Sequence, residues 1–432
     1  MNLLESVPED WIKATVGKYC DVQLGKMLQN DPVSEQDELK PYLRAINISK
    51  TGVDLSHEFR MWIRPSERER FRLCAGDILV SEGGDAGRTA IFSSNDDYYF
   101  QNAINRLRPQ SYSKILPEFI YYWFTFLKVS GYVEMVCNVA TIAHFTAEKV
   151  KAAPLVLPPL KAQQRIAQFL DQKTAQIDGL IEKKRALLER LAEKRQALIT
   201  QAVTKGLNPN APMKPSGIDW LGDIPAHWEV KRLRFLLDGG TINGLYKPKE
   251  QFSPDGFAFV QMGEAFRAVT FDGGTKDRVL ASDSEVKKWG LKEGDFLIAR
   301  RSLVFEGSGK AVKINKLEEN HLFESSMIRI RPISADKLSD FLSYYFQSSV
   351  CRAFFLSITK QVTISGIDSQ QLKDVSVPMP PLDEAARIQQ LCLESDQNHG
   401  VVTESILRSI SQLNEYRAAL ITSAITGKLA LD

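Results

Sequence analysis

A short junction of prolines and helix-forming residues occurs twice in this chain. PLVLPPLKAQQRIAQFL occupies residues 154–170, and a near copy, SVPMPPLDEAARIQQLC, occupies residues 376–392. The copies are offset by 222 positions, and the same offset aligns RQALITQAVTKGL from Arg195 with RAALITSAITGKL from Arg417. A repeat of this length indicates that the chain folds as two copies of one structural unit.

Shorter matches extend the repeat toward the start of each copy. Three landmarks pair between the copies: AGDILV around Asp77 with EGDFLI around Asp295, RLRP ending at Pro109 with RIRP ending at Pro332, and VPEDW ending at Trp11 with IPAHW ending at Trp228. The spacing between landmarks differs because the intervening loops differ in length. The predicted order is therefore globular unit, helix, globular unit, helix.

The first repeat ends in a segment with the features of a long helix. Pro158-Pro159 suits a helix entry, and no proline follows from Leu160 to about Thr204. Apolar residues recur at four-three spacing, interrupted by Lys184 and Arg195, which is typical of a coiled-coil seam. Gly206 is a suitable residue to end the helix.

The second repeat ends in a similar segment with a weaker stripe. SDQNHGVV places Gly400 where the stripe needs an apolar residue, so we expect this helix to be frayed or bent there. The residues predicted to form the interface of the helix pair, or of the helices with a partner, are Leu170, Ile177, Ile181, Leu188, Leu191, Leu198, Ile406, Ile410, Leu413 and Leu420.

The lengths of the helix and of the connector predict how the helices pair. About 43 helical residues span roughly 65 Å, and the Gly- and Pro-rich connector 206–225 would barely reach that far when extended. The second unit should therefore lie near the end of the first helix, and the second helix should run antiparallel to it. The predicted fold is mixed α/β, with two tandem-repeated globular domains, two long antiparallel coiled-coil helices and a pseudo-twofold axis. The predicted domains are 1–157 (first globular domain), 158–205 (helix), 206–226 (linker), 227–379 (second globular domain) and 380–432 (helix and C-terminal tail).

The composition is that of a globular cytoplasmic protein. Hydrophobic residues make up 44% and charged residues 25%, and the five cysteines are scattered without a CxxC pair, which fits a reducing compartment. The start MNLLESVPEDW has no signal-peptide pattern, and FIYYWFTFL is too short to cross a bilayer. The net charge of +2 does not by itself indicate nucleic-acid binding.

Motifs for chemistry are weak in this sequence. FEGSGK, residues 305–310, imitates a phosphate-binding or adenosylmethionine-binding loop, but Val304 stands where a phosphate loop needs its first glycine. Gly309 also aligns with Gly87 of the other repeat, so we interpret it as a turn glycine. The five histidines show no metal-ligand spacing. We expect no catalytic residue, no metal site and no cofactor in this chain.

The repeated architecture resembles the specificity subunit of type I restriction–modification systems. The similarity spans essentially the whole chain and includes LPPLKAQQRIAQFLDQKTAQID and GLNPNAPMKPSGIDWLGDIPAHWEVKRL. The resemblance implies two target recognition domains, each binding one half of a bipartite double-stranded DNA target, with helices that set the gap between the halves. It implies two methyltransferase subunits and restriction subunits as partners. S-adenosylmethionine, ATP and Mg²⁺ would be bound by those partners.

Long basic and amide side chains are the candidate DNA contacts that follow from this role. Arginine suits bidentate reading of guanine, and glutamine or asparagine suits adenine. The candidates are Arg60, Arg64, Arg68, Arg70, Arg72, Arg88, Gln101 and Asn102 in the first unit, and Arg267, Arg278, Arg300, Arg301, Lys310 and Lys313 in the second. For each of them a solvated surface charge or a phosphate contact remains an alternative.

Two other functions are compatible with the sequence. A two-headed coiled-coil scaffold could bind proteins rather than DNA, and its binding would lack the steep salt dependence of phosphate contacts. A self-sufficient methyltransferase or nuclease would need cofactor motifs, and labelled adenosylmethionine binding would reveal it.

Overall fold

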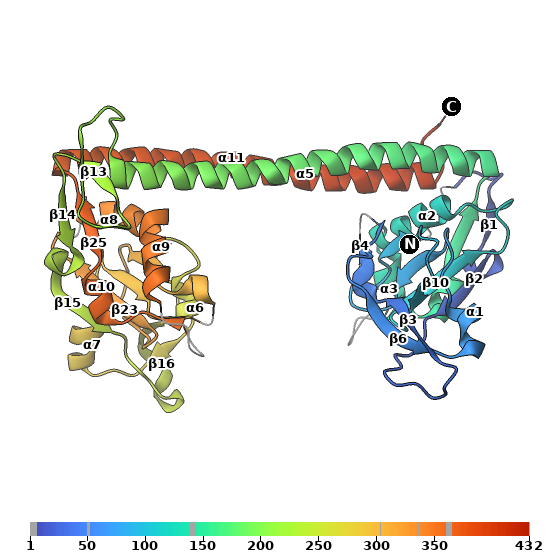
Figure 1. The fold of residues 1–432 in the computed structure, drawn as a ribbon, viewed down its shortest axis with the longest axis horizontal. Coiled ribbons are helices and arrows are strands. Elements are labelled where there is room, and N and C mark those ends of the chain that lie inside the picture. Colours follow the sequence, from blue (N-terminus) through green and yellow to red (C-terminus); the bar gives the residue numbers. More distant parts are fainter. Residues whose placement is uncertain are drawn as a thin grey trace. The chain divides into compact units, whose positions relative to one another are not determined.

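A computed structural model describes residues 7–49, 52–137, 144–302, 304–334, 337–359 and 365–431. Two compact units divide the chain, one formed by Met1–Lys184 with Leu407–Asp432 and the other by Arg185–Ile406. Each unit therefore contains one globular domain and one half of each long helix (Figure 1). Because the two units are separate bodies, each is described by itself.

Unit 1 is built around an antiparallel sheet of strand order β2-β10-β7-β8. A smaller sheet has the order β6-β3-β9, and β1 pairs with β11 at the base of the helix α5. The elements are β1 (Ile12–Thr15), β2 (Cys20–Leu24), β3 (Glu38–Leu43), β4 (Ile48–Ser49), β5 (Gly52–Val53), β6 (Phe59–Ile63), α1 (Arg68–Phe71), β7 (Ile78–Ser81), β8 (Thr89–Ile91), β9 (Tyr99–Phe100), β10 (Ile104–Pro109), α2 (Pro117–Val129), α3 (Tyr132–Val136), α4 (Ala147–Ala152), β11 (Pro154–Leu157) and α5 (Leu160–Lys205).

Unit 2 repeats this topology. Its main sheet has the order β15-β23-β19-β21-β17, its smaller sheet the order β18-β16-β22, and β14 pairs with β25. The elements are β12 (Met213–Pro215), β13 (Asp223–Pro225), β14 (Glu229–Arg232), β15 (Leu237–Asn243), β16 (Phe252–Val260), α6 (Met262–Ala265), β17 (Thr270–Phe271), β18 (Arg278–Val279), α7 (Asp283–Trp289), β19 (Phe296–Ala299), β20 (Arg301–Ser302), β21 (Ala311–Ile314), β22 (His321–Phe323), β23 (Met327–Pro332), α8 (Lys337–Gln347), α9 (Ser349–Ile358), β24 (Ser365–Gly366), α10 (Ser369–Lys373), β25 (Ser376–Met379) and α11 (Leu382–Ile425). The predicted mixed α/β fold with two repeated units is confirmed.

The long helices pack antiparallel within each unit. In unit 1, Leu170 of α5 shares a hydrophobic core with Ile421 and Ile425 of α11. In unit 2, Ile199 of α5 shares a core with Ile388 of α11. The late part of one helix thus meets the early part of the other in both units, as the connector length predicted.

The C-terminal ends of α5 and α11 pack against the IPAHW and VPEDW landmarks. Gly206, with φ +75°, ends α5 beside Trp228, whose indole nitrogen donates to Glu384 at 3.0 Å. In unit 1, Gly427 lies against Trp11 at the end of α11. VPEDW and IPAHW are therefore the segments that pack on the ends of the two helices.

The expected fraying at Gly400 is wrong, because α11 is continuous from Leu382 to Ile425. An exposed glycine costs a helix about 1 kcal/mol, which packing on either side can offset. Asp396 forms an ion pair with Arg195 of α5, and Ile406 is buried. These contacts hold the helix one turn before Gly400 and less than two turns after it.

The aromatic segment of α2 and the FEGSGK loop both have structural roles. Phe119, Trp123 and Phe124 are fully buried, so this segment belongs to the hydrophobic core of unit 1. Gly309 has φ +68°, and a Cβ there would lie 2.8 Å from Cβ of Phe355. Gly87 has φ +78° and packs against Val133 in the same way, so both are turn glycines.

Candidate nucleic-acid interface

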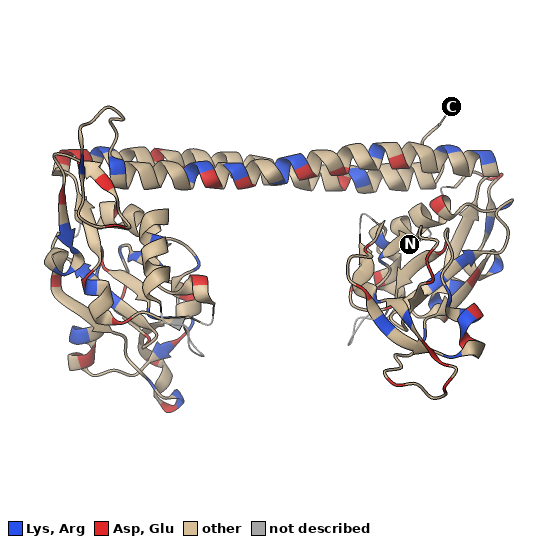
Figure 2. Ribbon diagram, in the orientation of Figure 1, with Lys and Arg blue, Asp and Glu red and all other residues tan. Residues whose placement is uncertain are grey.

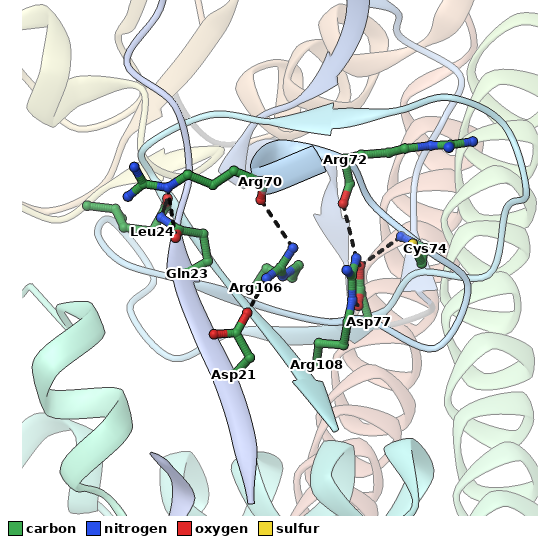
Figure 3. A network of polar contacts seen from close by, with 9 residues as sticks. All are labelled: Asp21, Gln23, Leu24, Arg70, Arg72, Cys74, Asp77, Arg106 and Arg108. Atoms are coloured by element: carbon green, nitrogen blue, oxygen red, sulfur yellow. Dashed lines mark hydrogen bonds and ion pairs between the residues drawn. The ribbon is translucent and has the colours of Figure 1, made fainter. Parts of the chain in front are cut away.

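In each unit, the aspartate of the Gly-Asp landmark binds the second arginine of the Arg-x-Arg-Pro landmark. We call this pair the polar frame; it is Asp77–Arg108 in unit 1 and Asp295–Arg331 in unit 2. Asp77 has no exposed surface and accepts two hydrogen bonds from Arg108, both of 2.7 Å, and one from the backbone amide of Cys74 (Figure 3). In unit 2, Asp295 accepts from Arg331 at 2.6 and 2.7 Å and from the amide of Lys292 at 2.8 Å. Bidentate bonding to the buried carboxylate raises the pKa of Arg108 and of Arg331, so both guanidinium groups stay charged.

The first arginine of each Arg-x-Arg-Pro landmark binds the end of a short helix. Arg106 is 4% exposed, forms an ion pair with Asp21, and donates from Nη1 to the carbonyl of Arg70 at 3.2 Å (Figure 3). Arg329 is 6% exposed and donates from Nη1 to the carbonyls of Lys288 and Gly290 at 3.1 and 2.9 Å. Burial lowers the pKa of both arginines. Each guanidinium thus binds the C-terminal carbonyls of α1 or α7, the groups that a helix leaves unpaired.

A lysine–glutamate pair holds the other end of the same helices. Lys26 lies 2.8 Å from Glu67 just before α1, and Lys247 lies 2.8 Å from Glu285 in α7. Burial alone would raise the pKa of Glu67, but its bonds to Lys26 and to the amide of Arg64 hold this pKa below the ordinary value. The bond from Lys247 likewise lowers the pKa of Glu285. The short helices α1 and α7 are therefore held by equivalent charged residues, a buried arginine at the C-terminal end and a lysine–glutamate pair at the N-terminal end.

Four of the eight predicted DNA contacts of unit 1 are arginines that form ion pairs at the surface. Ion pairs of exposed side chains are worth about 0–1 kcal/mol, so a phosphate or a base can replace the carboxylate at little cost. The pairs are Arg60–Glu58 at 2.6 Å, Arg64–Glu67 at 2.9 Å, Arg68–Glu38 at 2.8 Å and Arg72–Asp97 at 3.1 Å. Arg88 is half-buried and donates to the carbonyl of Ala45 at 2.6 Å, and Gln101 and Asn102 are half-buried at the turn before β10.

The predicted contacts of unit 2 are more dispersed. Arg278 is bound to Glu319 by two hydrogen bonds of 2.9 and 2.8 Å, and Lys313 forms an ion pair with Asp340 of α8. Arg300 is half-buried near the carbonyl of Ser325, and Arg267 donates to the carbonyl of Gly263 at 3.1 Å. Arg301 and Lys310 are exposed. The DNA contacts in both units remain predictions.

Sequence reasoning missed the exposed lysines of α7. It also missed the role of Arg106 and Arg329, the buried arginines that bind α1 and α7. Lys287 and Lys288 are exposed on α7, at the place where unit 1 carries Glu69 and Arg70. The signal was present in the repeat, because aligning Asp77 with Asp295 also aligns Arg70 with Lys288.

The residues of the predicted helix interface are buried to different depths. Leu170, Ile177, Ile181 and Ile406 are at most 7% exposed. Leu188, Leu191, Leu198, Ile410, Leu413 and Leu420 are half-buried. Arg195, one of the two charges in the stripe of the first helix, donates to Asp396 of the second at 2.6 Å. Arg417, its counterpart in the repeat, lies 3.1 Å from Asp178.

Charge is mixed along both units and both helices (Figure 2). Within the described ranges, no three His, Cys, Asp or Glu side chains are grouped so that they could hold a metal ion. None of the helices in the described part of the chain is long and apolar enough to span a membrane.

Known proteins match this chain over nearly its whole length. The type I restriction enzyme EcoKI specificity subunit of Escherichia coli K12 is 24% identical over 98% of this chain and 90% of that protein. The StySPI specificity subunit of Salmonella potsdam is 22% identical over 98% of this chain and 90% of its own length. The MjaVIII specificity subunit of Methanocaldococcus jannaschii is 21% identical over 98% of this chain and 94% of its own length.

Solved structures share the fold. A chain from a structure of the assembly and conformational transition of a type I R-M system matches with a TM-score of 0.74 and 17% identity, covering 98% of this chain and 99% of that one. The HsdS subunit from Thermoanaerobacter tengcongensis matches with a TM-score of 0.52 and 18% identity, covering 98% of each chain. The model of the type I restriction modification DNA specificity domain matches residues 8–190 and again residues 225–395. The chain therefore belongs to the type I restriction–modification DNA specificity family.

Proposed function

We propose that this chain is the DNA specificity subunit of a type I restriction–modification complex, in which each unit binds one half of a bipartite target. The observation that carries the proposal is the polar frame shared by the two units. Asp77 with Arg108 and Asp295 with Arg331 hold the same sheet positions, whereas the side chains mounted above them differ. One frame with two different outward surfaces suits a protein that reads two different half-sites.

The partners follow from this role. The long helices α5 and α11 dock two methyltransferase subunits and set the gap between the half-sites, and restriction subunits join the complex. S-adenosylmethionine, ATP and Mg²⁺ are bound by those subunits, and this chain contributes no catalytic residue.

The test is adenine-methylation mapping of genomic DNA from cells that express the methyltransferase subunits of the system with and without this chain. We expect a split motif, methylated once on each strand, that is lost when the chain is absent. If an active methyltransferase shows no motif that depends on the chain, the proposal fails.

A further inference from the structure

The short helices α1 and α7 carry a basic residue at the same place in the frame. Counted back from Asp77 and Asp295, Arg70 is equivalent to Lys288, and Phe71 to Trp289. The carbonyl of Arg70 accepts from buried Arg106, and the carbonyl of Lys288 accepts from buried Arg329.

The side chains of this pair are also held in the same way. The guanidinium carbon of Arg70 lies 5.1 Å from the centre of the Phe71 ring, and Nζ of Lys288 lies 4.4 Å from the centre of the Trp289 ring. A cation over an aromatic face is attracted to the ring electrons, which favours one orientation of the side chain. Both cations are exposed, so the frame presents each of them to solvent from a fixed backbone.

In unit 1 a third contact sets the plane of the guanidinium. Nε of Arg70 donates to Oε1 of Gln23 at 3.0 Å, and the amide nitrogen of Gln23 donates to the carbonyl of Leu24 at 2.6 Å (Figure 3). Among the residues that the structure describes, Nη1 and Nη2 of Arg70 make no hydrogen bond. The group is therefore anchored through Nε, with its terminal donors free.

Two free parallel donors on a fixed guanidinium match the O6 and N7 acceptors that guanine presents in the major groove. Its neighbours Arg64, Arg68 and Arg72 differ in this respect, because each forms an ion pair with a carboxylate.

We propose that Arg70 reads a guanine in the half-site bound by unit 1, with Gln23 as its positioning residue. Lys288 makes the equivalent contact to a base edge in the half-site bound by unit 2. This inference rests on the proposed function and extends it from the domains to particular residues.

The test compares variants of the full chain, each co-expressed with the methyltransferase subunits, by methylation mapping. R70A and R70K should each lose about ten- to a hundredfold of the discrimination at one G·C pair in one half of the motif. The other half should stay unchanged, and K288A should relax only that other half. K13A, which removes an exposed cation from β1, is the matched control and should leave the motif intact.

The variant Q23L separates positioning from charge. It should relax the same base pair as R70A, while the salt dependence of DNA binding by the complex stays that of the wild type, because Arg70 keeps its charge.

Three results would overturn the inference. R70A and R70K could methylate the wild-type motif unchanged, they could lose DNA affinity without any change of motif, or the half-site of unit 1 could contain no G·C pair. Failure of the proposed function is a separate result, since the wild-type chain would then yield no motif at all.

Discussion

At the scale of single residues, a buried carboxylate determines whether each unit keeps its frame. Asp77 accepts three hydrogen bonds from Arg108 and Cys74 without exposed surface of its own. Removing one partner of a buried ion pair leaves the other charge desolvated and uncompensated, which costs more than the pair contributes.

Replacing Asp77 by asparagine should therefore destabilise the chain. We expect D77N to lower the free energy of unfolding of unit 1 by about 2–4 kcal/mol, somewhat below the cost for a fully buried pair because Arg108 is 29% exposed. The measurement is thermal unfolding followed by circular dichroism. D31N, at an exposed loop position, should stay within about 0.5 kcal/mol of the wild type. Equal midpoints for D77N and the wild type would contradict the structural role of the frame.

At the scale of elements, each unit contains an ion pair between α5 and α11: Arg195–Asp396 in unit 2 and Arg417–Asp178 in unit 1. Arg195 and Arg417 are equivalent in the repeat, but their carboxylates are not: Asp396 corresponds to Thr174, and Asp178 to Gly400, one turn further along. The two repeats thus have the arginine at equivalent positions, whereas the positions of the aspartates differ by one helical turn. Thr174 instead hydrogen-bonds to Tyr122, whose counterpart Tyr344 bonds to Asp396.

The Arg195–Asp396 pair should contribute a measurable coupling energy, because both side chains are about three-quarters buried. In a double-mutant cycle with R195A and D396A, we expect about 0.5–1.5 kcal/mol of coupling in urea unfolding. The exchanged pair R195D/D396R should be more stable than either R195D or D396R alone. A coupling of zero would show that this ion pair does not stabilise the packing of the two helices.

At the scale of the whole molecule, the repeat extends across the chain ends. Gly427 at the end of α11 packs on Pro8 and Trp11, as Gly206 at the end of α5 packs on Pro225 and Trp228. In unit 2, the entry segment that contains Pro225 and Trp228 therefore packs on the end of α5, the helix before it in the sequence. In unit 1, the equivalent segment with Pro8 and Trp11 packs on the end of α11, which is the last helix in the sequence.

A circular permutant tests this arrangement. We expect a chain whose ends are joined by a short Gly/Ser linker, and which is reopened between Asn208 and Pro209, to direct methylation to the wild-type motif. The reason is that the new break lies at exposed residues of the connector, where few contacts are lost. A matched permutant opened after Leu188, inside α5, should fail to direct methylation. A folded first permutant with no motif would refute the equivalence of the two entry segments.

Much of the fold could be predicted from the sequence because its signals are local. The prolines at 158–159 and 380–381 place the helix starts, and α5 and α11 begin directly after them at Leu160 and Leu382. The four-three spacing predicted the apolar contacts at Leu170 and Ile406. Gly400 misled the prediction, since local propensity carries no information about the ion pair and packing that keep α11 continuous there.

The candidate site was less accessible to sequence reasoning. The sequence does not distinguish among the five arginines of this region, which are Arg60, Arg64, Arg68, Arg70 and Arg72. In the structure, four of them form ion pairs with carboxylates, whereas Arg70 donates a hydrogen bond to Gln23, 47 positions away in the sequence. The repeat aligns Lys288 with Arg70, but only the structure shows that a buried arginine binds the carbonyl of each of them.

The sequence by itself determined the duplication, the two long helices and their antiparallel pairing, because periodicity, proline geometry and chain length act within a segment or along the chain. The tertiary structure alone decided which charges are buried in the frame and which cations are left free to bind. Those outcomes depend on contacts between residues far apart in sequence, such as Asp77 with Arg108 and Arg195 with Asp396, and on the desolvation that burial imposes on them.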